Sequence, residues 1–152
     1  MKKMIGLMLV GLLVGGLLGQ AIAAEKGTAA EAEAMIQKAL DFYKTNGKEK
    51  TLAEVSNPTG QFVKGDLYVF IWDMNGVVIA HGTNSKLIGR DMSQMKDVDG
   101  KRFVYDGVEL AKAKGKGWVD YKWSNPTTKK VEAKSTYVVK VDDMVFCCGI
   151  YK

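Results

Sequence analysis

The sequence is poor in the residues that most enzymes use for catalysis and for metal binding. Its 152 residues include one histidine, two cysteines and two prolines. The cysteines, Cys147 and Cys148, are adjacent, and neither a Cys-x-x-Cys nor a Cys-x-x-Cys-His motif occurs. A zinc site and covalently attached haem are therefore not expected, because both need several such ligands at set spacings.

Motifs of the common hydrolases and transferases are also missing. There is no Gly-x-Ser-x-Gly motif and no phosphate-binding loop. Asp97 and Asp99 flank a turn before a predicted helix, and we interpret them as capping residues rather than as an acid and base pair. We therefore expect a protein that is not an enzyme and holds no cofactor.

The adjacent cysteines cannot form an ordinary disulfide with each other. A strained vicinal bridge, an intermolecular bridge and two buried thiols all stay open. Two buried thiols in the last strand are the simplest interpretation, because a free cysteine packs like a small hydrophobic residue.

The net charge of +5 is mild and spread along the chain. Lysine and arginine form no long cluster, so nucleic acid is not an expected partner. A small anionic ligand or an anionic surface suits this excess better.

The N-terminus is typical of a secretory signal peptide. Lys2 and Lys3 precede an uncharged apolar run from Met4 to Leu18, and the small residues of Ala21-Ile22-Ala23 follow. We expect residues 1–24 to be removed and residues 25–152 to form one domain in the periplasm or outside the cell. An uncleaved membrane anchor is the alternative, because the uncharged stretch is long enough to span a bilayer.

The remaining chain predicts an α+β domain. A capping box at Thr28 begins an amphipathic helix that ends near Asn46-Gly47, and a shorter helix follows and ends before Pro58. An irregular segment, residues 82–100, precedes a helix over 102–114. Strands are predicted over 67–72, 77–81, 117–123, 132–141 and 144–151, which gives a five-stranded antiparallel sheet with the long helix on one face.

Aromatic residues are frequent in these strands. Tyr68, Phe70 and Trp72 alternate, so they share one face of the first long strand, and Tyr121 and Trp123 alternate in a later strand. Aromatic residues in strands usually belong to the core. A buried tyrosine hydroxyl nevertheless needs a hydrogen-bond partner, and a carboxylate ligand is one candidate.

From residue 31 to residue 151 the chain resembles the single Cache domains, which are extracytoplasmic PAS-like sensors. The stretches that carry the resemblance are Asp66-Leu67-Tyr68-Val69-Phe70, Val78-Ile79-Ala80-His81, Leu87-Ile88-Gly89-Arg90-Asp91, Asp99-Gly100-Lys101-Arg102-Phe103, Gly117-Trp118-Val119-Asp120-Tyr121-Lys122-Trp123, Lys134-Ser135-Thr136-Tyr137-Val138 and Gly149-Ile150-Tyr151. Each stretch is short, but their order and spacing cover nearly all of the chain after residue 24.

The resemblance implies a long N-terminal helix packed on a five-stranded antiparallel sheet and a small pocket for an organic acid such as acetate, propionate or pyruvate. The expected ligand-binding residues are Tyr68, Phe70, Trp72, His81, Arg90, Tyr121, Trp123, Lys134 and Tyr137. Lys134 and Tyr137 lie three positions apart, so a regular strand directs them to opposite faces. Packing favours Tyr137 for the pocket, whereas the family pattern favours Lys134.

Three functions stay open at this stage. The first is a free-standing periplasmic domain that binds a short-chain carboxylate and acts with a membrane histidine kinase or chemoreceptor, since the chain ends at Lys152 without a second membrane segment. The second is a structural module without a ligand that forms a homodimer through the N-terminal helix. The third is a haem sensor with His81 as axial ligand.

Overall fold

The computed structural model describes residues 25–152, so the predicted signal peptide lies outside the described residues. No helix in that range is both long enough and apolar enough to cross a membrane. In chain order the elements are α1 (Ala29–Val55), β1 (Val63–Lys64), β2 (Leu67–Asp73), β3 (Val78–His81), the short 3-10 helix η1 (Ser85–Leu87), α2 (Phe103–Lys114), β4 (Lys116–Ser124), β5 (Val131–Val141) and β6 (Met144–Tyr151).

Helix α1 begins where the sequence predicts, but at Gly47 it kinks instead of ending. The side chain of Thr28 accepts a hydrogen bond from the backbone N–H of Glu31, and the Glu31 carboxylate accepts one from the N–H of Thr28, which completes the capping box. Gly47 has a φ of 80°, so the helix kinks there. A second segment then continues directly to Val55, and the two predicted helices are two parts of one element.

The sheet is antiparallel and has the order β1-β2-β6-β5-β4, with β3 also paired to β2. Strands β1 and β3 share the edge of β2 that faces away from β6. The fold is therefore the expected α+β arrangement, with one more strand than predicted. Strand β1 has two residues, which is too short to produce an alternating sequence pattern.

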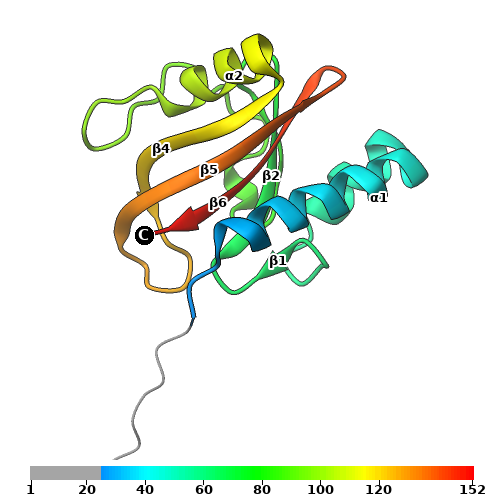
Figure 1. The fold of residues 1–152 in the computed structure, drawn as a ribbon, viewed down its shortest axis with the longest axis horizontal. Coiled ribbons are helices and arrows are strands. Elements are labelled where there is room, and N and C mark those ends of the chain that lie inside the picture. The colour runs from blue at the N-terminus through cyan, green and yellow to red at the C-terminus, as the bar shows by residue number, and fades with distance from the viewer. Residues whose placement is uncertain (1–24) are drawn as a thin grey trace, which may run out of the picture.

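Both faces of the sheet are covered. One face packs against α1, and the other packs against α2 and the irregular segment between β3 and α2. Figure 1 shows α2 next to β4 and α1 alongside β6 and β2. Strand β2 is buried on both faces, because Tyr68, Phe70 and Trp72 point to the α2 side while Val69 and Ile71 point to the α1 side.

The adjacent cysteines lie in β6 and point to opposite faces of the sheet. Both are free and fully buried, Cys147 on the α2 side and Cys148 on the α1 side. This confirms the interpretation as two buried thiols. Burial raises the pKa of the Cys148 thiol to about 12, so neither a thiolate nor a vicinal bridge is favoured.

Candidate functional site

A small cavity lies between the α2 side of the sheet and the irregular segment. The space open to the centre of a water-sized sphere is about 20 Å³, which is enough for one or two water-sized groups. Its lining comes from β2, β3, β4 and β5, from the irregular segment and from the first residue of α2. The lining residues are Tyr68, Phe70, Trp72, Val78, His81, Leu87, Met92, Phe103, Tyr121, Trp123 and Lys134.

Lys134 projects from β5 into this cavity and is 1% exposed. Its Nζ donates to the hydroxyl of Tyr68 over 2.7 Å. The same nitrogen lies over four aromatic rings, at 4.3 Å from the ring centroid of Tyr68, 5.0 Å from Phe70 and Tyr151, and 5.9 Å from Tyr121. Among residues 25–152 no carboxylate forms an ion pair with it.

Lys134 keeps its proton at neutral pH. Burial disfavours the charged ammonium, whereas the hydrogen bond to the Tyr68 hydroxyl and the faces of the surrounding aromatic rings favour it. Burial in turn raises the pKa of Tyr121 to about 12, so this phenol is neutral. The cavity wall therefore carries one positive charge that is compensated only by neutral rings and one hydroxyl.

The hydroxyl groups next to Lys134 form a chain with one direction. The Tyr151 hydroxyl donates to the backbone carbonyl of Ser124 over 2.8 Å. Since that donation uses its proton, the 3.2 Å contact between the Tyr68 and Tyr151 hydroxyls requires Tyr68 to be the donor. The order of donation is thus Lys134 to Tyr68, Tyr68 to Tyr151, and Tyr151 to Ser124, and we call these four residues the relay.

His81, the last residue of β3, presents a neutral imidazole to the cavity. Its Nδ1 accepts hydrogen bonds from the backbone N–H groups of Thr83 at 3.2 Å and Asn84 at 3.0 Å, so the proton is on Nε2. Burial, helped by the charge of Lys134, lowers the pKa of His81 to about 3. The ring stacks on Phe70 at 5.5 Å between centroids. Within residues 25–152 no acceptor is found for the Nε2–H group, which leaves it available to a ligand.

Gly149 in β6 makes room for Lys134. A Cβ atom at this position would clash with Cε of Lys134 and with the hydroxyl of Thr136. Thr136 in turn is hydrogen-bonded to the Tyr121 hydroxyl at 2.9 Å. The glycine therefore allows the lysine stem to cross the sheet face and bring its ammonium to the rings.

Seven of the nine predicted site residues meet at this cavity, and two do not. Arg90 is exposed on the irregular segment and is not part of the lining. Tyr137 lies on the α1 side of the sheet, where its ring packs 5.2 Å from that of Trp118. The preference for Tyr137 over Lys134 was wrong, because β5 is regular and places even-numbered residues such as Lys134 on the cavity side.

Sequence reasoning missed four apolar residues of the lining and one residue behind it. Leu87 and Met92 are buried within a segment that is mostly polar, and their apolar side chains were a usable signal. Val78 and Phe103 lie at the ends of elements, where too few residues follow a periodic pattern to show which face is buried. Tyr151 enters the site through its pairing with Lys134 across β5 and β6, which only the register reveals.

Comparison with known proteins places this geometry in a family. The profile described as Single Cache domain 2 matches residues 21–151. The sensor histidine kinase MctS of Rhizobium johnstonii is 34% identical over 84 residues, which is 55% of this chain and 18% of that protein. The methyl-accepting chemotaxis protein McpP of Pseudomonas putida is 34% identical over 73 residues, 48% of this chain and 13% of that protein. The chain thus spans less than a fifth of the length of these curated relatives.

A solved structure described as "Structural basis for carboxylic acid recognition by a Cache chemosensory domain" is similar in fold. It superposes with a TM-score of 0.63 at 28% identity, over 79% of this chain and 85% of that one. Cache domains are extracytoplasmic sensory domains that bind ligands and are not catalytic. With a profile match over nearly all of its described residues, the chain belongs to the single Cache domain 2 family.

Proposed function

We propose that this domain binds a short-chain carboxylate in the cavity at Lys134 and reports its presence to a membrane histidine kinase or chemoreceptor. The observation that carries the proposal is the ammonium of Lys134, which is 1% exposed and has no carboxylate partner among residues 25–152. A buried charge without a counter-ion is unfavourable, so a carboxylate that enters the cavity gains a charge-assisted hydrogen bond in a region of low dielectric constant.

The surrounding groups suit a small acid. The Nε2–H of His81 and the Tyr68 hydroxyl are further donors on the same wall, and they can share the oxygens of one carboxylate with Lys134. Phe70, Trp72 and Trp123 enclose the remainder of the ligand. The volume of about 20 Å³ favours the smallest acids among those of two to four carbons, and the surrounding rings would have to move apart to admit them.

The comparisons support the signalling part of the proposal. The two curated relatives are a sensor histidine kinase and a chemotaxis receptor, and the solved structure cited above concerns carboxylic acid recognition. The N-terminal sequence supports export by a cleaved signal peptide, which would place the domain in the periplasm or outside the cell. We place the domain there as a binding protein without catalytic activity.

A thermal-shift screen of the purified protein tests the binding step. Acetate, propionate, pyruvate and butyrate at millimolar concentrations are compared with acetamide and propionamide, which have similar shapes and no charge. We expect at least one acid to raise the melting temperature while neither amide does. No shift with any of the acids would favour the alternative, a structural module that dimerises through α1.

The haem alternative does not suit this cavity. A porphyrin is far larger than the space beside His81, and the imidazole already packs against Phe70 at 5.5 Å and Tyr68 at 5.1 Å between ring centroids. The purified protein should therefore show no Soret band after incubation with haemin.

A further inference from the structure

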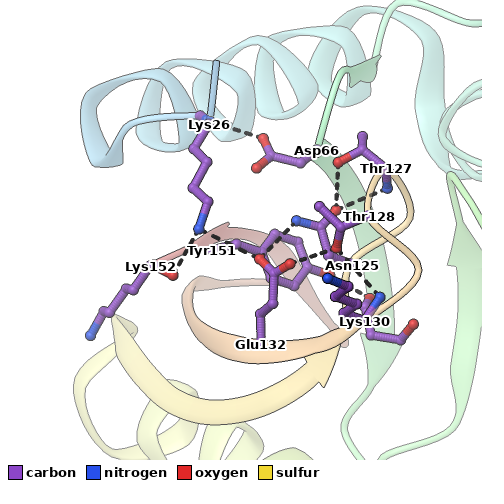
Figure 2. Close-up of polar contacts among 11 residues, drawn as sticks. Lys26, Asp66, Asn125, Thr127, Thr128, Lys130, Glu132, Tyr151 and Lys152 are labelled. Atoms are coloured by element: carbon purple, nitrogen blue, oxygen red, sulfur yellow. Dashed lines mark hydrogen bonds and ion pairs between the residues drawn. The ribbon is translucent and has the colours of Figure 1, made fainter. Parts of the chain in front are cut away.

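The segment that precedes α1 is held by polar contacts from three other parts of the chain. Nζ of Lys26 donates to the backbone carbonyl of Lys152 over 2.9 Å and lies 3.5 Å from the carboxylate of Glu132. The backbone N–H of Gly27 donates to the buried carboxylate of Asp66 over 2.8 Å. Figure 2 shows Lys26, Asp66, Glu132 and Lys152 close to the start of α1, and we call these four residues together with Gly27 the clasp.

Glu132 also ties the clasp to the turn between β4 and β5. Its two carboxylate oxygens accept hydrogen bonds from Nδ2 of Asn125 at 3.2 Å and from the hydroxyl of Thr128 at 2.5 Å. Asn125 follows Ser124, whose carbonyl is the last acceptor of the relay. Figure 2 shows Tyr151 next to Glu132 and Asn125, so the end of the relay and the clasp are neighbours in space as well as in sequence.

The relay and the clasp are joined through the backbone at three further points. Lys134 lies two residues after Glu132, Tyr68 lies two residues after Asp66, and Tyr151 directly precedes Lys152. Lys134, Tyr68 and Tyr151 each have a clasp residue within two positions along the chain. A rearrangement around Lys134 has three short routes to the start of α1.

A carboxylate at Lys134 changes the relay in a defined direction. The Tyr68 hydroxyl has one proton, which it donates to Tyr151 when the cavity holds no anion. A carboxylate is a stronger acceptor than a neutral hydroxyl, so the Tyr68 hydroxyl then donates to the carboxylate instead of to Tyr151. Tyr151 then loses its donor, and the relay loses one of its three bonds.

We propose that the clasp is the output element of the domain, and that carboxylate binding at Lys134 loosens it through the relay. This inference rests on the proposed function. It identifies the start of α1, with the adjacent C-terminal residue, as the part of the surface whose order differs between the empty and the occupied domain. A signalling partner would read the ligand there.

Reciprocity between the two sites supplies the test. If binding loosens the clasp, part of the binding free energy is spent on breaking the clasp contacts. A variant that already lacks some of these contacts should therefore bind the carboxylate more tightly. Lys26→Met removes both contacts of Nζ, and Glu132→Gln weakens the ion pair. Both side chains are at the surface, at 48% and 18% exposure, so the variants are expected to fold. Lys48→Met is the matched control, because it breaks a comparable ion pair with Asp143 far along α1.

Calorimetric titration with acetate and with propionate gives the readout. We expect Lys26→Met and Glu132→Gln to bind about fivefold more tightly than the wild type, and Lys48→Met to bind as the wild type does. Hydrogen–deuterium exchange in the peptide over residues 25–31 should become faster when the wild type is saturated, whereas exchange over the turn at residues 142–143 should not change.

Two outcomes would overturn the inference, and they are distinguishable. If the wild type binds one of these acids but the clasp variants show unchanged or weaker affinity, the clasp is not coupled to the cavity, although the proposed function stands. If neither acid binds the wild type, the proposed function fails, and this inference fails with it.

Discussion

At the scale of single residues, Lys134 and His81 are both buried but carry different charges. A hydrogen bond to Tyr68 and the faces of the aromatic rings favour the ammonium form of Lys134, whereas burial and that same ammonium keep the imidazole of His81 neutral. The sequence singled out both residues, but it could not assign their protonation states. Those states depend on which groups surround each side chain. Tyr151 reaches Lys134 from the neighbouring strand, and the N–H groups of Thr83 and Asn84 reach His81 only because of the conformation of the turn after β3.

Lys134→Met should make the empty protein more stable. Methionine fills similar volume and removes a buried charge that has no anionic partner, so we expect the free energy of unfolding to rise by about 1 to 3 kcal/mol. Urea denaturation at pH 7.5 measures this change. Lys140→Met, on an exposed position of the same strand, should stay within about 0.5 kcal/mol of the wild type. A clear loss of stability for Lys134→Met would mean that the ammonium has a structural role.

His81 should make stability depend on pH. The unfolded chain binds a proton at this residue below its ordinary pKa of 6.5, whereas the folded chain does so only near 3, so acid favours unfolding between these values. The stabilisation is complete above pH 6.5 and is lost as the pH falls towards 3. Between pH 7.5 and pH 5 the titration of His81 lowers the free energy of unfolding by about 2 kcal/mol.

His81→Asn isolates this effect. The asparagine Oδ1 can still accept the N–H groups of Thr83 and Asn84, but the side chain does not titrate. We expect urea denaturation of the variant to show a stability difference between pH 7.5 and pH 5 that is smaller than in the wild type by about 2 kcal/mol. Equal differences in the two proteins would contradict the assignment of a buried, neutral imidazole.

At the scale of elements, sequence patterns succeeded where a strand or helix has a clear period or a capping motif. The capping box predicted the start of α1, and alternation predicted that Tyr68, Phe70 and Trp72 share one face of β2. Strand β5 gave no such guidance, because the sheet is covered on both sides and its residues are buried on both faces. The choice between Lys134 and Tyr137 therefore needed the register with β4 and β6.

Lys134 of β5 packs directly against Gly149 of β6, so a substitution at Gly149 tests whether this packing positions the ammonium for binding. In Gly149→Ala the new methyl group pushes on the stem of Lys134 and on Thr136, so we expect a loss of about 1 to 3 kcal/mol in stability together with weaker binding of acetate or propionate. Gly117→Ala is the control, because its methyl group would push on Leu110, which is not a lining residue. It should lower stability without lowering affinity. Equal effects of the two variants on affinity would contradict a role for Gly149 in positioning Lys134.

At the scale of the whole molecule, the sequence predicted the α+β architecture and an antiparallel sheet of five strands, and the family resemblance named seven of the residues that line the cavity. It could not predict that the start of α1, the β4–β5 turn and the C-terminus meet at one place (Figures 1 and 2). These segments are far apart in the chain and are joined by single polar side chains such as Lys26 and Glu132. Arg90 shows the same limit, since an irregular segment has no period that reveals which side chains turn inwards.

The most direct measurement is calorimetric titration of the purified protein with propionate and, in parallel, with propionamide, for the wild type and for Lys134→Met. If the buried ammonium binds the carboxylate, the wild type binds propionate and does not bind propionamide, and Lys134→Met binds neither, although it remains folded. Equal binding of the acid and the amide by the wild type, or unchanged propionate affinity in folded Lys134→Met, would contradict a carboxylate site at Lys134.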